Sequence, residues 1–314
     1  MTPVYVDHFG YQLGEVRQSV EEAVAAGRTR SSLAALRDAG FRHHQTCGPA
    51  TSAYRLAEAA VARIEPHLGA IGAIVYATCI PANGTADPGV ASADVKDLMD
   101  FPASRLQARF GLDRAFVVGL NQQACTGMLG SLRLARALIT AEPGIDRALC
   151  VTADRFPPGA SYEQAYNLIS DGAAACVVSR QPGRYRILAA AHVTNGAMVG
   201  AGDDETVGAY FTYTHRVVTA ALDQAGVKAA ELRWVVPQNT NPKAWLILAR
   251  LLGLGPSTVV HAPTLADAAH VISADNVVNL AHLEASGAPR PGDTLLLTMA
   301  GFGMNWQALV LERQ

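Results

Sequence analysis

Four short apolar segments, separated by helical or turn-rich stretches, set the strongest constraint on the fold of this chain. They lie at residues 71–79, 115–120, 147–154 and 172–179. Continuous apolar runs of this length are typical of strands buried on both faces. Such a sheet needs helices on both sides, and residues 51–64, 101–110 and 127–140 have the Ala- and Leu-rich pattern of helices. The pattern predicts an α/β fold with a mixed or parallel sheet.

The C-terminal part of the chain repeats this alternation more loosely. We expect strands at 186–192, 234–237, 293–300 and 306–312, and helices at 209–225, 242–252 and 276–285. Residues 81–90 are expected to form a turn-rich loop, and the Gly- and Asp-rich residues 197–207 either a mobile flap or a solvent loop. Half of the residues are hydrophobic and 6% are aromatic, so Ala, Val, Leu and Ile must build most of the core.

Charge, termini and cysteines narrow the functional class. The N-terminus lacks a basic segment followed by an apolar one, and no uninterrupted apolar run of about 18 residues occurs, so neither a targeting segment nor a membrane span is expected. A net charge of -2 does not indicate the basic surface that binds nucleic acid, although a local basic patch can still dock an acidic carrier protein. The cysteines form neither a CxxC pair nor a disulfide framework, which favours a reducing cytoplasm. They are Cys47, Cys79, Cys125, Cys150 and Cys176.

Cys125 has the most informative setting of the five. It lies between the predicted strand 115–120 and the predicted helix 127–140. Backbone N–H groups and the dipole at a helix N-terminus stabilise a thiolate, and the same N–H groups stabilise an oxyanion on a thioester carbonyl. Ala124 and Gly127 leave room for a substrate. Local sequence alone leaves open whether Cys125 is a nucleophile or a buried structural cysteine.

Three further segments carry candidate functional groups. Gly301–Asn305 is either a hairpin turn or a loop whose N–H groups approach a substrate, and Pro237–Asn241 either caps a strand end or holds a substrate carbonyl. These segments make Asn239, Asn241, Gly301 and Met304 candidates for substrate contact. His270 precedes Asp275, either as an acid–base group with its orienting carboxylate or as a structural histidine before a helix cap.

Metal and nucleotide motifs are not evident. His43 and His44 lie near Cys47, but no further ligands follow at metal spacing, and no metal site is expected. The chain contains neither a P-loop nor a dinucleotide-binding GxGxxG motif.

Together these segments resemble the β-ketoacyl-acyl carrier protein synthase III family of thiolase-fold enzymes, over residues 50–314. Ala124–Met128 is similar to the nucleophile motif of the family and Ile74–Ile80 to its strand that ends in an Ala-Thr turn. Ser170–Ala175 resembles its "GDGAGA" segment, and Gly301–Trp306 resembles its C-terminal Gly loop.

The resemblance implies a thiolase-like fold of two similar αβαβα halves forming one five-layered unit. Residues 1–165 would carry the nucleophile, and residues 166–314 would carry His270 and the Gly loop. It implies an acyl-enzyme on Cys125 and an oxyanion hole formed by the N–H groups of Cys125 and Gly303. The substrate would be a thioester of coenzyme A or of an acyl carrier protein, with no other cofactor. A homodimer in fatty acid or specialised metabolism is implied in the same way.

Two departures from the family pattern bear on the reaction. Gln238 stands where the family usually has the His of a Pro-His-x-x-Asn motif, and His270 replaces its later catalytic Asn. A branch with a Gly-His…Ser-Asp-Asn segment resembles Ala269–Asn276, and some members of that branch transfer acyl groups to hydroxyls or other acceptors. Gln238 donates a hydrogen bond but cannot exchange a proton, whereas a heteroatom acceptor needs a base, which His270 with Asp275 would supply.

The pattern therefore favours acyl transfer to an oxygen, nitrogen or sulfur atom of a small-molecule acceptor. Two alternatives stay open. One is decarboxylative Claisen condensation giving a β-ketoacyl thioester, and the other is a non-catalytic partner subunit of an active homologue.

Overall fold

The computed structural model describes residues 2–81, 99–157, 159–164, 167–302 and 304–314. Ten strands form one mixed sheet in the order β12-β11-β13-β14-β10-β1-β9-β6-β4-β5. Its N-terminal strands are β1 (Tyr5–Leu13), β4 (Ala73–Ala77), β5 (Phe116–Leu120), β6 (Arg147–Asp154) and β9 (Gly172–Ser179). Its C-terminal strands are β10 (Tyr185–Thr194), β11 (Trp234–Pro237), β12 (Val259–Val260), β13 (Thr294–Gly301) and β14 (Asn305–Arg313).

The two groups of strands meet at β1 and β10. This junction has two registered pairs, Tyr5 with Arg186 and Val6 with Tyr185, whereas β1 pairs with β9 at seven positions and β10 pairs with β14 at nine. Strand β9 lies between β1 and β6 although it follows residue 165. The division of the chain at residue 165 stays a prediction.

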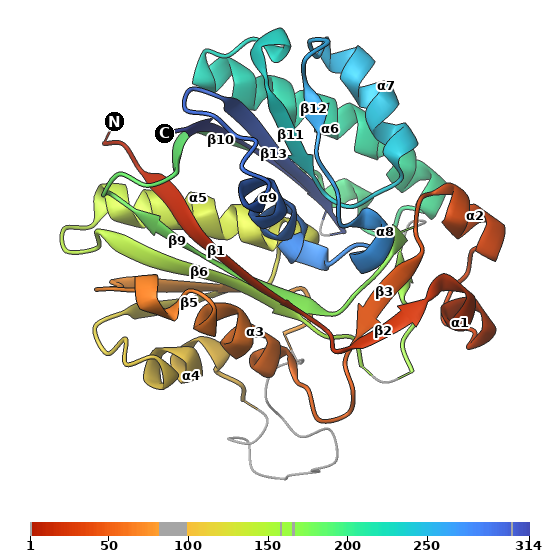
Figure 1. The fold of residues 1–314 in the computed structure, drawn as a ribbon, viewed down its shortest axis with the longest axis horizontal. Coiled ribbons are helices and arrows are strands. Elements are labelled where there is room, and N and C mark those ends of the chain that lie inside the picture. The colour runs from red at the N-terminus through yellow and green to blue at the C-terminus, as the bar shows by residue number, and fades with distance from the viewer. Residues whose placement is uncertain (1, 82–98, 158, 165–166, 303) are drawn as a thin grey trace.

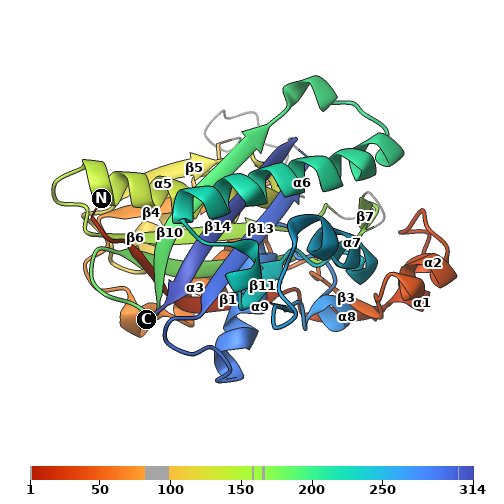
Figure 2. The same ribbon diagram turned by 90° about the horizontal axis from the view of Figure 1, so that it is seen from above.

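Helices form three layers around the two groups of strands (Figure 1). In the middle layer, α5 (Gly127–Ala141) and α9 (Asp275–Ala285) share one apolar core with strands of both groups. The helices α3 (Ala53–Ala62) and α4 (Pro102–Arg109) cover the outer face of the N-terminal strands. On the opposite side, α6 (Asp203–Ala225) and α7 (Pro242–Leu252) cover the C-terminal strands (Figure 2). The predicted α/β, thiolase-like architecture with five layers is confirmed.

Smaller elements complete the chain near the carboxyl ends of the strands. An N-terminal lobe contains β2 (Val16–Ser19), α1 (Val20–Ala25), α2 (Leu33–Asp38) and β3 (His43–Thr46). A short hairpin of β7 (Glu163–Gln164) and β8 (Asn167–Leu168) and the helix α8 (Leu265–Ala268) pack near it. Single 3-10 turns occur at Glu65–His67, Ala124–Thr126, Gly196–Met198, Ala229–Glu231 and Ile272–Ala274.

The two predicted loops have different outcomes in the structure. Helix α6 begins at Asp203, earlier than residue 209, so residues 203–207 are helical and the prediction of a loop across 197–207 is wrong for them. The predicted turn at 81–90 lies outside the described residues after Pro81.

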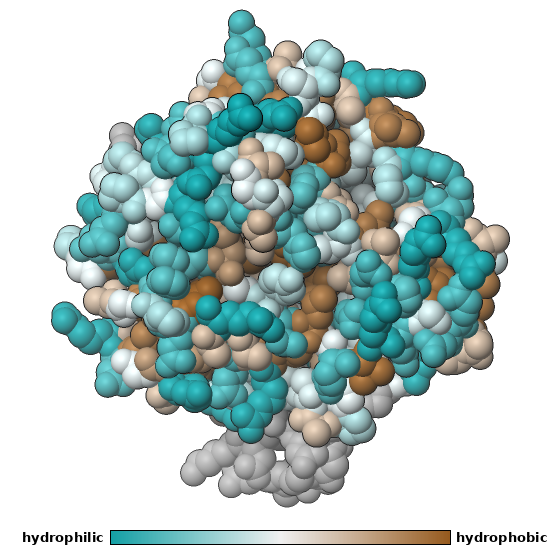
Figure 3. Space-filling view, in the orientation of Figure 1, coloured by the Kyte–Doolittle hydropathy of each residue, from teal (hydrophilic) through white to brown (hydrophobic). Residues whose placement is uncertain are grey.

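The described surface is mostly polar, with apolar residues in separate small groups on the face shown in Figure 3. One apolar group lies on α7, where Leu246, Ile247 and Leu251 are exposed. Within the ranges given above, every helix is too short or too polar to cross a lipid bilayer.

Candidate active site

Cys125 lies in a tight turn between strand β5 and helix α5. The turn begins at Ala124, whose φ of +42° is in the left-handed region that side chains other than glycine rarely adopt. Cys125 is 6% exposed, and the N-terminus of the 15-residue helix α5 follows two residues later. The predicted position of Cys125 at a strand-to-helix junction is confirmed.

The C-terminal Gly loop lies directly against this turn. A Cβ atom added at Gly301 would meet the carbonyl oxygen of Gln123 at 2.9 Å and the backbone nitrogen of Cys125 at 3.0 Å. These distances are too short for a side chain, so residue 301 must be glycine for the two backbones to approach. The loop therefore reaches the nucleophile turn. Gly303 lies outside the described residues, and the oxyanion hole that the resemblance implies stays a prediction.

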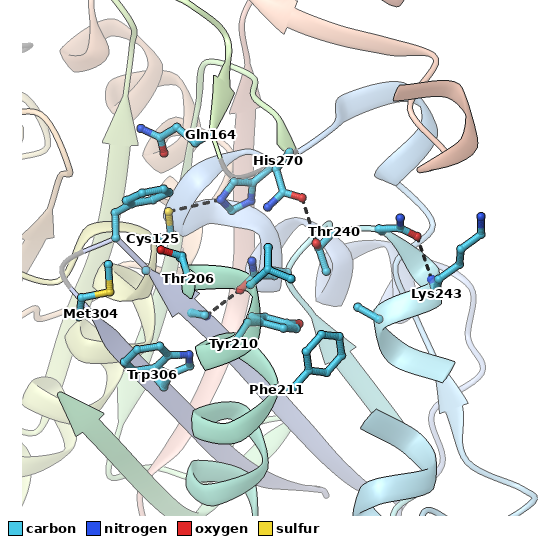
Figure 4. A pocket seen from close by; sticks show the side chains of 18 of the residues that line it. Cys125, Gln164, Thr206, Tyr210, Phe211, Thr240, Lys243, His270, Met304 and Trp306 are labelled. Carbon is cyan, nitrogen blue, oxygen red and sulfur yellow. Dashed lines mark hydrogen bonds between the residues drawn. The ribbon is translucent and has the colours of Figure 1, made fainter. Parts of the chain in front are cut away.

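The imidazole of His270 is adjacent to the sulfur of Cys125. Its Nε2 atom lies 3.3 Å from Sγ of Cys125, and the contact is drawn in Figure 4. The backbone of His270 is fixed on both sides, because its N–H donates to the carbonyl of Leu168 and its own carbonyl accepts the N–H of Ser170. The Ser170–Ala175 segment thus helps to position the histidine.

The carboxylate of Asp275 orients His270 from the other side of the ring. Its Oδ2 atom lies 2.5 Å from Nδ1 of His270. The same carboxylate accepts the backbone N–H groups of Val271 and Asn239, each at 2.7 Å, and its side chain is fully buried. Because these three polar contacts hold it, the carboxylate has a fixed direction, and the ring that it orients presents Nε2 to Cys125.

The electrostatics of this trio favour an ion pair between sulfur and imidazole. A hydrogen bond from the thiol of Cys79 and the adjacent His270 lower the pKa of Cys125, against the opposing effect of burial. Burial disfavours a charged His270, but Asp275 and Cys125 outweigh it and raise the pKa of the imidazole. Both directions favour a thiolate on Cys125 beside an imidazolium on His270.

A cavity of about 350 Å³ opens onto Cys125 and His270. One wall is largely aromatic and comes from helix α6 and the β13–β14 loop (Figure 4). The residues of this wall are Thr206, Val207, Tyr210, Phe211, Phe302, Met304 and Trp306. Polar side chains line the facing wall and the rim: Gln164, Asn167, Gln238, Thr240, Asn241 and Lys243. The cavity suits an organic substrate with an apolar part and a few hydrogen-bonding groups.

Most of the predicted contact residues line this cavity. Gln238, Asn241, Gly301 and Met304 do so, and Oε1 of Gln238 accepts the N–H of Ala300 at 2.6 Å. Because its oxygen is engaged in this way, Gln238 offers its NH₂ group to the cavity.

Asn239 differs from the expectation that it contacts substrate. It is fully buried, is absent from the described cavity lining, and its side chain bonds Thr264, Ala269 and Asn279. Its role is therefore to position Asp275, because it places a backbone N–H on that carboxylate.

Several site residues could not be identified from the sequence. Cys79 and Ser273 lie beside the nucleophile turn, where Oγ of Ser273 donates to the carbonyl of Ala124 at 3.0 Å. Tyr210 and Phe211 reach the cavity from α6. The apolar pattern of a helix shows which residues are buried, but not that these two line a cavity. Across the parts of the chain that are described, no group of three His, Cys, Asp or Glu side chains is arranged to hold a metal ion.

Comparison with known families agrees with this geometry. The family model described as "3-Oxoacyl-[acyl-carrier-protein (ACP)] synthase III" matches residues 121–196, and its C-terminal companion matches residues 222–313. The two matches together cover Cys125, His270 and Asp275. The chain belongs to the 3-oxoacyl-[acyl-carrier-protein] synthase III family.

Individual synthase III relatives extend the match over most of the chain. A β-ketoacyl-[acyl-carrier-protein] synthase III of Dinoroseobacter shibae is 27% identical, covering 91% of this chain and 89% of the relative. That of Erythrobacter litoralis is 30% identical, covering 68% of this chain and 73% of the relative. These relatives are acyl-transferring synthases, and this member is accordingly an acyltransferase-like enzyme.

Solved structures place the same fold in both synthases and transferases. The synthase III of Pseudomonas aeruginosa superposes with a TM-score of 0.78 at 25% identity, covering 99% of this chain and 98% of that structure. ChlB3, described as an acyltransferase, superposes with a TM-score of 0.81 at 23% identity, with 99% and 98% coverage. The likeness to ChlB3 shows a shared fold.

Proposed function

We propose that this synthase III relative transfers an acyl group from a coenzyme A or acyl-carrier-protein thioester, through Cys125, to a heteroatom of a small-molecule acceptor. The observation that carries the proposal is the contact of His270 Nε2 with Sγ of Cys125 at 3.3 Å, together with the buried Asp275 behind the ring. This arrangement holds a nucleophile, a proton carrier and an orienting carboxylate in one line.

The first step loads the enzyme. The thiolate of Cys125 attacks the thioester carbonyl, and the resulting oxyanion accepts hydrogen bonds from the backbone N–H of Cys125 and, in this proposal, of Gly303. The carbon–sulfur bond of the donor then breaks. The departing thiolate takes the proton of the His270 imidazolium, which leaves an acyl-enzyme and a neutral imidazole.

The second step uses the imidazole that the first step has neutralised. An acceptor O–H, N–H or S–H group enters the cavity, and Nε2 of His270 takes its proton as it attacks the acyl carbonyl. The tetrahedral intermediate collapses and releases Cys125 as a thiolate. Because His270 is again an imidazolium, the charge balance of the resting pair is restored.

The amide of Gln238 favours acyl transfer to a heteroatom over condensation. Decarboxylative condensation in this family benefits from two neutral donors on the malonyl carbonyl. Here one position holds an amide, and the other holds His270, whose Nε2 gives up its proton in the first step and then acts as an acceptor. The names of the relatives favour a second candidate, condensation to a β-ketoacyl thioester. The homodimer and the cytoplasmic setting expected from the sequence belong to the same proposal.

A two-stage mass measurement tests the proposal. The protein is incubated with a short-chain acyl-coenzyme A, and its intact mass is compared with that of Cys125→Ala. We expect an acyl adduct on the wild type that the variant lacks. The loaded protein is then offered a panel of alcohols, amines and thiols, or malonyl-acyl carrier protein.

Loss of the adduct with formation of an acylated alcohol, amine or thiol supports heteroatom transfer. Release of carbon dioxide with a β-ketoacyl product would establish the condensing alternative instead. An unmodified protein after exposure to thioester would contradict both enzymatic functions and leave the non-catalytic partner subunit.

A further inference from the structure

The side chain of Gln307 ties the nucleophile turn to strand β14. This residue is 3% exposed, and its Nε2 donates to Oε1 of Gln123 at 2.9 Å and to Oγ1 of Thr126 at 3.1 Å. The hydroxyl of Thr126 in turn donates to the carbonyl of Gln123 at 2.7 Å. One amide therefore joins the two residues that flank Ala124 and Cys125.

Helix α5 leaves room for this contact at Gly130. A Cβ atom added there would overlap Oε1 of Gln123 and would lie 3.2 Å from Nε2 of Gln307. A larger residue at position 130 would therefore displace the two amides. Glycine inside a helix lowers the stability of the helix, so α5 gives up helix propensity at the point where the amides lie against it.

Packing alone does not explain an amide at position 307. Oε1 of Gln307 is buried, and within the described parts of the chain it has no hydrogen-bond partner. A buried acceptor without a partner lowers stability. An apolar side chain of similar length would fill the same space without this unpaired oxygen. The amide instead supplies the donor group that the nucleophile turn receives.

The turn needs support from outside because its backbone is strained. Ala124 has a φ of +42°, and a residue in this region keeps its conformation only where several contacts fix it. Asn305, two residues before Gln307 on β14, donates to the carbonyl of Gln122 at 3.2 Å and so fixes the start of the turn. Gln307 extends this support beyond Cys125 to the start of α5.

We propose that Gln307 is a positioning residue for the proposed acyl transfer: it fixes the turn on both sides of Cys125 and so directs the backbone N–H of Cys125 toward the oxyanion. The inference rests on the proposed function and deepens it. The sulfur of Cys125 has a separate support, its contact with His270. Loss of the amide should therefore weaken the stabilisation of the oxyanion more than it changes the sulfur.

Two reactions of Cys125 separate these effects. Loading from a short-chain acyl-coenzyme A passes through an oxyanion, whereas alkylation by iodoacetamide does not. Gln307→Met keeps the length of the side chain and removes the donor, and Gln123→Met removes an acceptor at the other end of the contact. Gln12→Met is the matched control, because the amide of this glutamine bonds Arg63 and a backbone carbonyl of its own strand β1.

In single-turnover measurements of coenzyme A release, Gln307→Met should load about 10- to 100-fold more slowly at saturating thioester. The thioester concentration that gives half of the maximal rate should not change, because the lost contact acts on the transition state. Alkylation of Cys125 in Gln307→Met, and both reactions of Gln12→Met, should match the wild type. Gln123→Met should be slowed less, because the bond to Thr126 remains, and the double variant should be no slower than Gln307→Met.

Wild-type loading by folded Gln307→Met would overturn the role of Gln307 and leave the acyl transfer intact. If loading and alkylation fall together, the amide does not act through the N–H of Cys125, which also overturns the inference. If Gln307→Met does not fold, slowed loading by Gln123→Met supports the inference and wild-type loading overturns it. A wild type that is alkylated at Cys125 but never loads would instead overturn the proposed function, and the inference with it.

Discussion

Nε2 of His270 lies 3.3 Å from Sγ of Cys125, although 145 positions separate the two residues in the chain. The cysteine comes from the turn between β5 and α5, and the histidine follows helix α8. The fold therefore brings a nucleophile and a proton carrier together from its N-terminal and C-terminal strand groups.

The first prediction concerns the thiolate. The hydrogen bond from Cys79 and the nearby His270 lower the pKa of Cys125 to about 5, so alkylation should be constant above about pH 6 and fall as the pH drops through 5. His270→Ala removes the positive neighbour and should move this midpoint upward by about 1–3 units. His192→Ala, at an exposed histidine on β10, is the control. Equal midpoints in His270→Ala and wild type would contradict the ion pair.

The second prediction concerns Asp275. Asp275→Asn removes the charge that favours the imidazolium and misplaces the ring proton, so acyl transfer to the acceptor should fall about 10²–10⁴-fold. Stopped-flow release of coenzyme A and quantification of the acylated acceptor separate loading from transfer. Asp267→Asn changes an exposed carboxylate on α8, which pairs with Arg17, and should leave both steps unaltered. Wild-type transfer by Asp275→Asn would argue against an orienting role.

The third prediction concerns the choice of reaction. Gln238→His replaces an amide by a ring nitrogen that donates toward the malonyl carbonyl, and should raise the decarboxylation of malonyl thioesters about tenfold over wild type. Radiolabelled carbon dioxide release measures the change. Gln238→Ala controls for simple loss of the amide, because it also frees the N–H of Ala300. If wild type already decarboxylates as fast as Gln238→His, the amide does not limit condensation.

The fourth prediction concerns stability. Burial raises the pKa of Asp154 to about 7, from an ordinary 3.8, against the hydrogen bonds from Thr78 and Cys79. The native state therefore binds this proton more tightly, and the contribution of Asp154 to stability is full below pH 3.8 and lost as the pH rises through 7. This loss should lower the free energy of unfolding of the wild type by about 2–4 kcal/mol, and Asp154→Asn should remove it.

Urea unfolding at several pH values measures the fourth prediction. The free energy of unfolding of Asp154→Asn should vary less between pH 4 and 7 than that of wild type. Asp146→Asn, at an exposed carboxylate that pairs with Arg180, should follow the wild-type curve. Parallel curves for Asp154→Asn and wild type would mean that Asp154 does not titrate in this range.

Buried strands were the most predictable part of the fold. Strands β6 and β9 have the predicted bounds because continuous apolar runs fit no exposed element. Strand β1 was not predicted, since Asp7, His8 and Gln12 interrupt its apolar pattern and a bulge after Asp7 breaks its register. Pairing with β9 and β10 overrides this weak local signal.

Site residues could be predicted where a reactive residue type occurs at an informative position in the chain. Cys125 at a strand-to-helix turn and His270 before Asp275 could be selected in this way. Asn239 could not be assigned correctly, because an amide serves equally as a substrate contact or a structural bond until its direction is known. Cys79 could not be distinguished from the other cysteines, because nothing in the sequence shows that it lies beside Ser273 at the nucleophile turn.

The approach of Gly301 to the turn at Cys125 has a consequence for folding of the chain. The turn and its histidine partner form a reactive pair once His270 and the end of strand β13 have docked against the turn. Before this docking we expect Cys125 to react as an ordinary thiol, because the histidine that lowers its pKa is not yet beside it. The high reactivity of this sulfur should therefore appear late in folding. Labelling of Cys125 near neutral pH would then detect the fully folded protein.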